Sequence, residues 1–413
     1  MDEQQKACIG IILALSIPNN KRVLRKRKRW VKQWISKRRQ YTHLNVIKEV
    51  QLSDPKDFIN YFRMDIDNYN KLLSMVAPLI TKMNTNMRES ISANERLAVT
   101  LRYLATGRTF EDLKFTSIIS PTTISLIVIE TCEAIITVLK DYIQLPKTAE
   151  QWQNVSNNFG AKWNFSNCIG SIDGKHVNIK KPPNSGSLYY NYKGTFSIVL
   201  MAVVNANLQF MMVDVGANGR ISDGGVLYYT KCWEKFQNNT LNIPSPSCLP
   251  NTTEQFPYVF VGDEAFSLQP NLMKPYSQHD LTNHERRIFN YRLSRARRTV
   301  ENAFGVLASR FGVFQKPINL GPEKATLITL ACCYLHNFLI ATNQNIYCSK
   351  TLLIEENTET GEIQNGSDIT PNLFTPLKKT PIRTISLEAK DVRNKYSSYF
   401  CREGQVPWQV NMI

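Results

Sequence analysis

Four short apolar runs lie between residues 167 and 265, and they limit the folds that this chain can adopt. Each run is rich in residues that favour strands and is bounded by Gly, Asn or Pro. Because the runs are nearly continuous rather than alternating, they predict a sheet that is covered on both faces. The predicted strands are residues 167–179, 196–207, 210–217 and 257–265.

Helical patterns interrupt and follow these strands. Residues 222–236 predict a capped helix between the third and fourth strands. A long helix over about 286–311 and a buried helix over 325–340 are predicted after the fourth. Three strands, a helix, a strand and further helices indicate a mixed α/β layer architecture. We place this domain at residues 165–340.

The preceding segment, residues 41–164, predicts a separate all-helical domain. Apolar residues recur three and four positions apart over 57–80 and 93–107, and Ser120-Pro121 is a typical start for a further helix. A long helix, a short helix, a tight turn and a capped helix form the outline of a helix-turn-helix. The capped helix is almost entirely apolar, however, which favours packing over contact with DNA.

The net charge of +16 is concentrated in two parts of the chain. Residues 1–40 hold 12 Lys and Arg against 2 Asp and Glu, and residues 165–340 hold 17 against 11. This distribution suits a polyanionic partner such as DNA.

The basic arm, residues 1–40, has its densest charge over 21–39, which includes Arg25, Arg27 and Arg29. Such a run is typical of a nuclear import signal or a nucleic-acid contact. An amphipathic helix docked by Trp30 and Trp34 is an alternative, and the two are compatible because docked tryptophans would leave the charges outward.

The remaining composition indicates a compartment. Nine cysteines without a CxxC pair favour a reducing environment. The apolar stretch 7–17 is too short to span a bilayer, and the acids before it disfavour a signal peptide. We expect no membrane association, and a location in the nucleus with some cytoplasmic protein.

The last segment, residues 341–413, predicts a polar linker followed by a tail. Asn, Thr, Gly, Glu and Pro are prominent up to about residue 386. Residues 389–404 regain a helical pattern, so the C-terminus is expected to form a short helix that docks back.

Three acids lie beside small or apolar residues rather than in a charged run: Asp173 in SIDGKH, Asp263 in VGDEAF and Glu301 in RRTVENAFG. We expect both aspartates to end strands at the carboxyl edge of the sheet, and Glu301 to face them from the long helix. A desolvated acid requires a cation, and hard cations such as Mg²⁺ or Mn²⁺ prefer oxygen ligands. The alternative for Glu301 is a helix ion pair with Arg297.

Other acids and potential ligands carry less weight. Asp223, in GRISDGG, either lies near the metal or caps the following helix. Asp214 and Glu264 are expected to point away from the site. His176 either contacts substrate or is held structurally at the sheet edge. Core packing is favoured over zinc binding for three residues of an apolar helix: Cys332, Cys333 and His336.

Six basic residues near these acids are predicted to contact phosphates: Lys175, Lys193, Arg220, Arg295, Arg297 and Arg298. The aromatic segment LYYNYKG, residues 188–194, offers rings that could stack on bases, although tyrosines beside strands are more often structural.

Several long motifs of this chain resemble the PIF/Harbinger superfamily of DDE transposases, in particular their domesticated relatives, the Harbinger transposase-derived nucleases. These motifs are CIGSIDGKHV, NSGSLYYNYKG, VDVGANGRISDGG, VFVGDEAF and RIFNYRLSRARRTVENAFG. The resemblance covers residues 60 to 340 and the terminal VPWQ. It implies an RNase H-like catalytic core, a DDE triad of Asp173, Asp263 and Glu301, and a separate Myb/SANT-like protein that binds DNA.

The sequence therefore predicts a metal-dependent endonuclease, a hydrolase that acts on the phosphodiester bonds of DNA through a two-metal mechanism. A DNA-binding or chromatin-associated adaptor that keeps the fold without chemistry is the alternative. A transposase that is still mobile, and a homo-oligomer, both stay open at this point.

Overall fold

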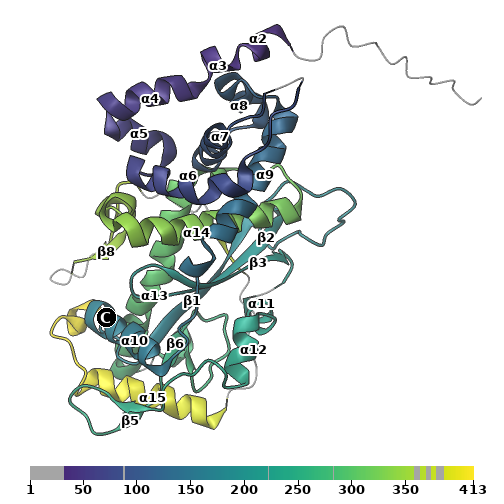
Figure 1. Cartoon of the computed structure of the whole chain (residues 1–413). Helices are drawn as coiled ribbons and strands as arrows, with labels where there is room; N and C mark the ends of the chain where they lie inside the picture. Colours follow the sequence, from purple (N-terminus) through teal and green to yellow (C-terminus); the bar gives the residue numbers. More distant parts are fainter. Residues whose placement is uncertain are drawn as a thin grey trace, which may run out of the picture.

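The computed structural model describes residues 32–86, 89–221, 223–281, 283–357, 363–368, 374–377 and 386–413. Figure 1 shows a helical part at one end of the molecule and a sheet with its covering helices below it. The predicted contacts of Arg25, Arg27 and Arg29 fall outside the described residues.

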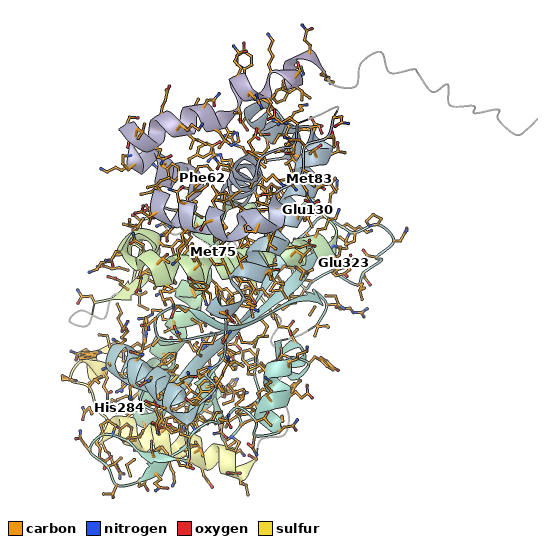
Figure 2. All side chains as sticks on the ribbon, viewed as in Figure 1. Phe62, Met75, Met83, Glu130, His284 and Glu323 are labelled. Carbon is orange, nitrogen blue, oxygen red and sulfur yellow. The ribbon has the colours of Figure 1, made fainter. Side chains whose placement is uncertain are left out.

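The helical part begins with short helices and continues with longer ones that pack around a common core. Local signals set their ends: Ser92 and Glu95 form a capping box at the start of α7, and Gly107, with a φ of +62°, ends it. Phe62, labelled in Figure 2, is 1% exposed in this core. The helices are α2 (Gln33–Ser36), α3 (Arg38–Tyr41), α4 (His43–Ser53), α5 (Pro55–Phe62), α6 (Ile66–Ile80), α7 (Ala93–Thr106), α8 (Phe110–Ser117), α9 (Pro121–Val138) and the 3₁₀ turn η1 (Lys140–Tyr142). The next helix, α10 (Ala149–Trp163), packs against the sheet instead, where its Trp152 and Phe159 are buried.

The helix α9, which the sequence presented as the second half of a helix-turn-helix, is a packing element. It contacts α6, α7 and α8 on one side and the long helix α14 (Pro322–Tyr347) on the other. Its buried side includes Ile124, Ile127 and Val128. Both α9 and α14 are long and apolar enough to cross a membrane, but 67% of the apolar window of α14 is buried, as in a core helix.

The sheet has the strand order β3-β2-β1-β6-β7, with β10 also paired to β1. β1, β2 and β3 are antiparallel neighbours, whereas β6 runs parallel to β1 and β7 runs parallel to β6. The four predicted strands are confirmed, and the sheet is mixed. The strands are β1 (Cys168–Asn178), β2 (Ser197–Val204), β3 (Phe210–Asn218), β6 (Val259–Val261), β7 (Leu272–Met273) and β10 (Thr375–Pro376).

Helices cover both faces of this sheet, as the apolar runs predicted. Leu200, Ala202 and Val204 of β2 join the core formed with α13 (His284–Arg310) and α14. Val199 and Met201 point the other way, into the core formed with α11 (Asp223–Tyr228) and α12 (Lys231–Gln237). The helical N-terminal part followed by a mixed sheet between helices is consistent with the predicted RNase H-like core.

Part of the segment predicted as a polar linker is structured against α13. It forms the 3₁₀ turn η4 (Lys350–Leu352) and the hairpin of β8 (Ile354–Glu356) and β9 (Ile363–Asn365). The side-chain amide of Asn302 on α13 donates to the Ile354 carbonyl over 3.2 Å. A polar composition is typical of a linker, so the sequence predicted one. The contacts that order this segment come from residues far away in the sequence, such as Asn302, and local composition does not reveal them.

The predicted C-terminal helix is present as α15 (Leu387–Cys401), which packs on α13 and is followed by η5 (Gln409–Met412). Tyr396 and Phe400 of α15 are fully buried beside Phe289 of α13. A small hairpin of β4 (Ser247–Cys248) and β5 (Gln255–Phe256) completes this end of the protein. Short 3₁₀ turns η2 (Gln278–Asp280) and η3 (Gly312–Gln315) flank α13.

Candidate functional site

The two predicted aspartates lie at matching distances beyond a paired position of two neighbouring parallel strands, Asp173 within β1 and Asp263 just after β6. Ser171 of β1 pairs with Val261 of β6, and Asp173 and Asp263 each follow two residues later. Parallel strands carry equivalent residues to the same edge of a sheet, so this register directs both acids to the same edge.

The prediction that Asp173 ends its strand is wrong. β1 continues to Asn178, because Asp173 and the residues after it stay paired with β2. On its other side, β1 pairs with β6 only up to Ser171, and with β10 from Lys175 onward. Asp173 therefore lies where β1 passes from one neighbour to the other, and Asp263 follows the strand that ends there.

Asp173 is buried and is paired with a cation from its own strand. Its side chain is 5% exposed, its Oδ1 accepts the Gly174 N–H over 2.8 Å, and its Oδ2 lies 2.8 Å from Lys175 Nζ. Residues two apart on a strand point to the same face, which places Lys175 beside it. Burial opposes the charge on Lys175, but Asp173 and, more weakly, Glu301 outweigh it and raise the pKa of the ammonium.

Glu301 belongs to the same charged group. α13 packs Val300, Ala303 and Phe304 into the core under β1 and β2, which orients the neighbouring Glu301 toward Asp173 and Lys175. Burial raises the pKa of Glu301, the Asp173 charge raises it further, and Arg297 opposes both. The helix ion pair with Arg297 is also present, with Nη2 and Oε1 3.4 Å apart.

Asp263 is held by the turn that it begins, since its Oδ1 accepts the Ala265 N–H over 2.9 Å. The next acid, Glu264, offers its backbone carbonyl to Lys274 Nζ at 3.4 Å. Asp214 pairs with Met201 in the register that places Val213 beside Ala202, the partner of Asp173. Asp214 therefore faces away from Asp173, as predicted, and burial raises the pKa of its carboxyl.

The donor set fits a hard divalent cation. Asp173, Asp263 and Glu301 supply only carboxylate oxygens, which Mg²⁺ and Mn²⁺ prefer. The ammonium against buried Asp173 shows that this position is stabilised by positive charge. Within the described ranges, no three His, Cys, Asp or Glu side chains are already gathered as a metal site. Asp223 begins α11, and its side chain is outside the described part of the chain.

The three arginines of the long helix that were predicted to contact phosphates divide between two partners. Arg297 faces Glu301, whereas Arg295 and Arg298 lie 3.2 and 2.8 Å from Glu356 Oε2. Glu356 comes from β8, is 4% exposed, and also accepts the Tyr291 hydroxyl over 2.8 Å. The structure thus brings Arg297 to the carboxylates and gives Arg295 and Arg298 a buried partner. The phosphate contacts predicted for all three arginines stay predictions.

Sequence reasoning missed Glu356. The excess of positive charge in RLSRARR was a signal that further acids lie nearby. Which acid it is cannot be read from the sequence, because Glu356 is 58 residues away from Arg298 in a polar stretch.

The remaining predicted ligands are structural. His336 is fully buried, with Nε2 2.8 Å from the Leu208 carbonyl and Nδ1 3.0 Å from the Tyr347 hydroxyl. Cys332 and Cys333 are also fully buried. The predicted core packing of these three residues is therefore confirmed. His176 is 1% exposed, contacts Ser197 Oγ at 2.9 Å, and burial lowers its pKa to about 4. It is a neutral histidine held by a hydroxyl.

Lys193 and Arg220 are exposed, as phosphate contacts require. Lys193 lies in the loop between β1 and β2, and Arg220 follows β3 at the same end of the sheet. The described structure thus leaves both side chains available to solvent.

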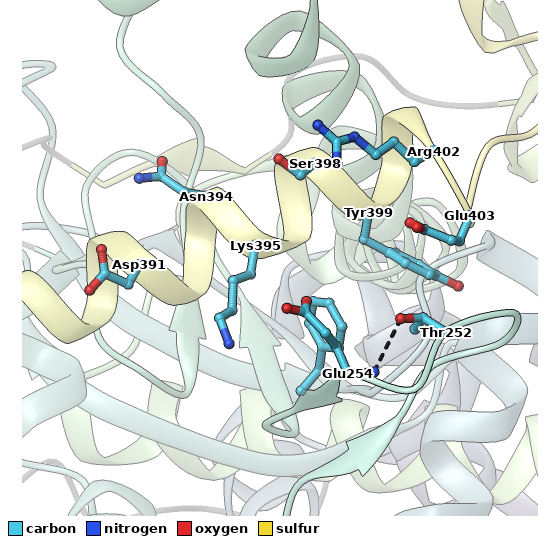
Figure 3. A pocket seen from close by; sticks show the side chains of 10 residues that line it. Thr252, Glu254, Asp391, Asn394, Lys395, Ser398, Tyr399, Arg402 and Glu403 are labelled. Atoms are coloured by element: carbon cyan, nitrogen blue, oxygen red, sulfur yellow. Dashed lines mark hydrogen bonds between the residues drawn. The ribbon is translucent and has the colours of Figure 1, made fainter.

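A hollow lies elsewhere, between α15 and the β4–β5 hairpin (Figure 3). It has a volume of about 630 Å³ and is lined by Glu254, Asp391 and Glu403 against Lys395 and Arg402. Because acids outnumber bases there, this hollow is unsuited to a polyanion.

Residues 172–337 match the model of the DDE superfamily endonuclease. This range begins one residue before Asp173 and includes Asp263 and Glu301. The chain contains a DDE superfamily endonuclease domain.

Known proteins are related to this chain at a distance. It is 27% identical over 296 residues to "Protein ALP1-like" of Arabidopsis thaliana, covering 70% of this chain and 71% of that protein. It is 24% identical over 269 residues to "Putative nuclease HARBI1" of Rattus norvegicus, covering 64% of this chain and 72% of that protein. No solved structure matches.

Proposed function

We propose that this chain is a divalent-metal-dependent DNA endonuclease of DDE transposase type, a domesticated Harbinger transposase-derived nuclease. One observation carries the proposal: the parallel register of β1 and β6 brings Asp173 and Asp263 to one level, and Glu301 lies within electrostatic reach of Asp173. The endonuclease domain match spans all three acids.

Asp173, Asp263 and Glu301 would hold Mg²⁺ or Mn²⁺ in this site, with Asp223 as a further ligand. When bound, a pair of such ions supplies an activated water and stabilises the oxygen that leaves the phosphodiester. The rigid strand pairing around Asp173 fixes its carboxylate, and α13 fixes Glu301.

The cations of the site complement the acids. Lys175 and Arg297 already face the carboxylates, so both can bind the backbone of an approaching strand once the acids are occupied by metal. Lys193 and Arg220 would hold phosphates further along the same edge.

The test is a nicking assay on supercoiled DNA with Mg²⁺ or Mn²⁺, comparing the native chain with Asp173→Asn. We expect nicking by the native chain only, and none with a chelator. Metal-dependent nicking that persists undiminished in Asp173→Asn would refute the assignment.

A catalytically silent DNA-binding or chromatin-associated adaptor is the second candidate. The observation in its favour is that two acids are already neutralised within the chain, Asp173 by Lys175 and Glu301 by Arg297. Equal DNA affinity of the native and Asp173→Asn chains, without nicking by either, would support it.

The proposal extends to partners and location. A separate Myb/SANT-like protein is proposed to supply sequence-specific DNA binding, since α9 is committed to packing within the described structure. The basic arm is proposed to direct the chain to the nucleus, leaving some in the cytoplasm. A homo-oligomer is compatible with this assignment.

A further inference from the structure

The loop that joins β1 to β2, residues 179–196, presents large apolar side chains to solvent. Leu188 is 49% exposed, and Tyr190 and Tyr192 are each 47% exposed. Neighbouring exposed apolar side chains on a soluble protein mark a contact with a partner. This segment contains no Asp or Glu, and it carries three exposed lysines: Lys180, Lys181 and Lys193.

The tip of this loop is held rigidly. The Asn191 side chain is buried, donates to Thr195 Oγ1 at 2.8 Å and to Ser197 Oγ at 2.9 Å, and accepts the Lys193 N–H at 3.0 Å. The Tyr190 ring packs edge-on against Phe196 with centroids 5.2 Å apart. The exposed rings are therefore preorganised, which lowers the entropic cost of stacking on a ligand.

One tyrosine of the segment has a different role. Tyr189 is partly buried against the core under the sheet, and its carbonyl accepts the Ser197 N–H over 2.9 Å. The structural use of tyrosines that the sequence suggested thus holds for Tyr189, whereas Tyr190 and Tyr192 expose about half of their surface.

The loop continues directly from the strand that carries Asp173. At about 3.3 Å per residue, Asn178 lies roughly 17 Å beyond Asp173, a span of about five nucleotides at 3.4 Å each. The Tyr192 hydroxyl donates to the Pro376 carbonyl over 2.9 Å, and Pro376 belongs to β10, which pairs with β1 at Lys175. The Tyr192 ring is therefore anchored to the strand that pairs with β1 just beyond Asp173, and it lies beside His176, with ring centroids 6.1 Å apart.

We propose that Tyr190 and Tyr192 stack on unpaired bases of the DNA strand that leaves the cleavage site, with Leu188 in apolar contact with these bases, while the loop lysines neutralise its phosphates. This inference rests on the proposed function. Aromatic rings interleaved with cations bind single-stranded nucleic acid without sequence preference. A protein partner is disfavoured, because lysines are depleted in protein interfaces.

The test measures affinity of the full chain for two DNA duplexes in the presence of a chelator, so that neither is cut. One duplex carries a run of unpaired thymines, and the other is fully paired. Tyr190→Ala should weaken binding to the unpaired form by about 5- to 150-fold, as loss of one base–aromatic stack does, and should leave the paired form within about twofold.

Two further variants separate stacking from charge. Tyr190→Phe should bind both duplexes like the native chain, because stacking does not use the hydroxyl. Lys181→Ala should weaken binding to both and reduce the log–log salt slope by about 0.7 to 0.9, the contribution of one phosphate. Tyr190→Ala should leave that slope unchanged.

Tyr41→Ala is the matched control. Tyr41 is 56% exposed and has Lys37 Nζ 5.9 Å from its ring, the same distance as Lys193 from Tyr192, but it lies on α3 in the helical part (Figure 1). Its affinity for both duplexes should equal that of the native chain. Leu188→Ala keeps the Tyr190–Phe196 ring pair, and it should also weaken binding to the unpaired duplex. It therefore distinguishes a lost base contact from a loop that loosens in Tyr190→Ala.

Native affinity of both Tyr190→Ala and Leu188→Ala for the unpaired duplex would overturn the inference, as would equal losses on both duplexes. The outcome is separable from the proposed function. A chain that cuts DNA without discriminating the duplexes fails only the stacking inference, whereas one that discriminates without cutting fails only the nuclease assignment.

Discussion

Two groups of charges include side chains of the helix α13, and they differ in how far their acids are exposed to solvent. The first, which we call the edge group, comprises Asp173, Lys175, Arg297 and Glu301, and Glu301 is 40% exposed. The second, the hairpin group, joins Arg295 and Arg298 to Glu356, whose side chain is 4% exposed. Both contain arginines of the single run RLSRARR.

The difference teaches what each group can do. A buried acid shared by two arginines and the Tyr291 hydroxyl has its hydrogen-bonding capacity largely used inside the protein. The edge group pairs acids with cations one to one and stays accessible through Glu301. In the proposed function, a metal would bind the acids of the edge group and a phosphate its cations, whereas the hairpin group joins the hairpin of β8 and β9 to α13.

The largest effect is expected from the acids of the edge group. Asp173→Asn, Asp263→Asn and Glu301→Gln should each reduce DNA cleavage by about 10²–10³-fold or more, because each would remove a proposed ligand of the metal that stabilises the transition state. Thermal unfolding should change little. Nicking rates near the native value in any one variant would remove that residue from the site.

The hairpin group should show the reverse pattern. Glu356→Ala leaves Arg295 and Arg298 buried without their acid, which should lower the free energy of unfolding by about 3 kcal/mol. Urea unfolding measures this loss. Glu89→Ala, which removes the partner of Arg39 at the surface, is the control and should change the free energy of unfolding far less than Glu356→Ala does. Equal losses in the two variants would contradict the comparison.

A pH titration extends the comparison to the opposite face of β1, where His176 is buried and neutral. Its pKa is about 4 in the folded protein, below the ordinary value of 6.5. The unfolded chain therefore takes up the proton first as the pH falls. Stability should be complete above about pH 6.5 and should decrease progressively between pH 6.5 and 4, by roughly 2 kcal/mol or more for this group.

Burial also lowers the pKa of His336 to about 4. Its protonation on unfolding therefore lowers the free energy of unfolding further in the same pH range. Urea unfolding at a series of pH values measures the sum. Unfolding free energies that stay constant between pH 6.5 and 4 would show that neither imidazole is held neutral.

The smallest effect separates neighbouring arginines. Arg297→Lys keeps the charge at the edge group but loses the planar fork, so cleavage should fall by about tenfold with little change in the unfolding temperature. Arg298→Lys should instead lower the free energy of unfolding, by about 1 kcal/mol. If Arg298→Lys reduced cleavage without any loss of stability, Arg298 would belong to the edge group.

The sequence alone determined four strands of the sheet and their order along the chain. Nearly continuous apolar runs can be buried only between two layers, and residues 196–207 indeed became β2, buried along its whole length. The endonuclease domain was equally evident, because its motifs are local. Asp173, Asp263 and Glu301 could be named as candidates, since each stands alone beside apolar residues.

Only the tertiary structure decided how charges are shared. Asp173 lies within β1 rather than at its end, because β2 and then β10 continue the pairing. Arg295, Arg297 and Arg298 look equivalent in the sequence. In the structure, however, Glu356 of a hairpin more than 50 residues away forms ion pairs with Arg295 and Arg298. Local patterns fix burial and secondary structure, whereas the partner of a charge depends on which distant segments the fold brings together.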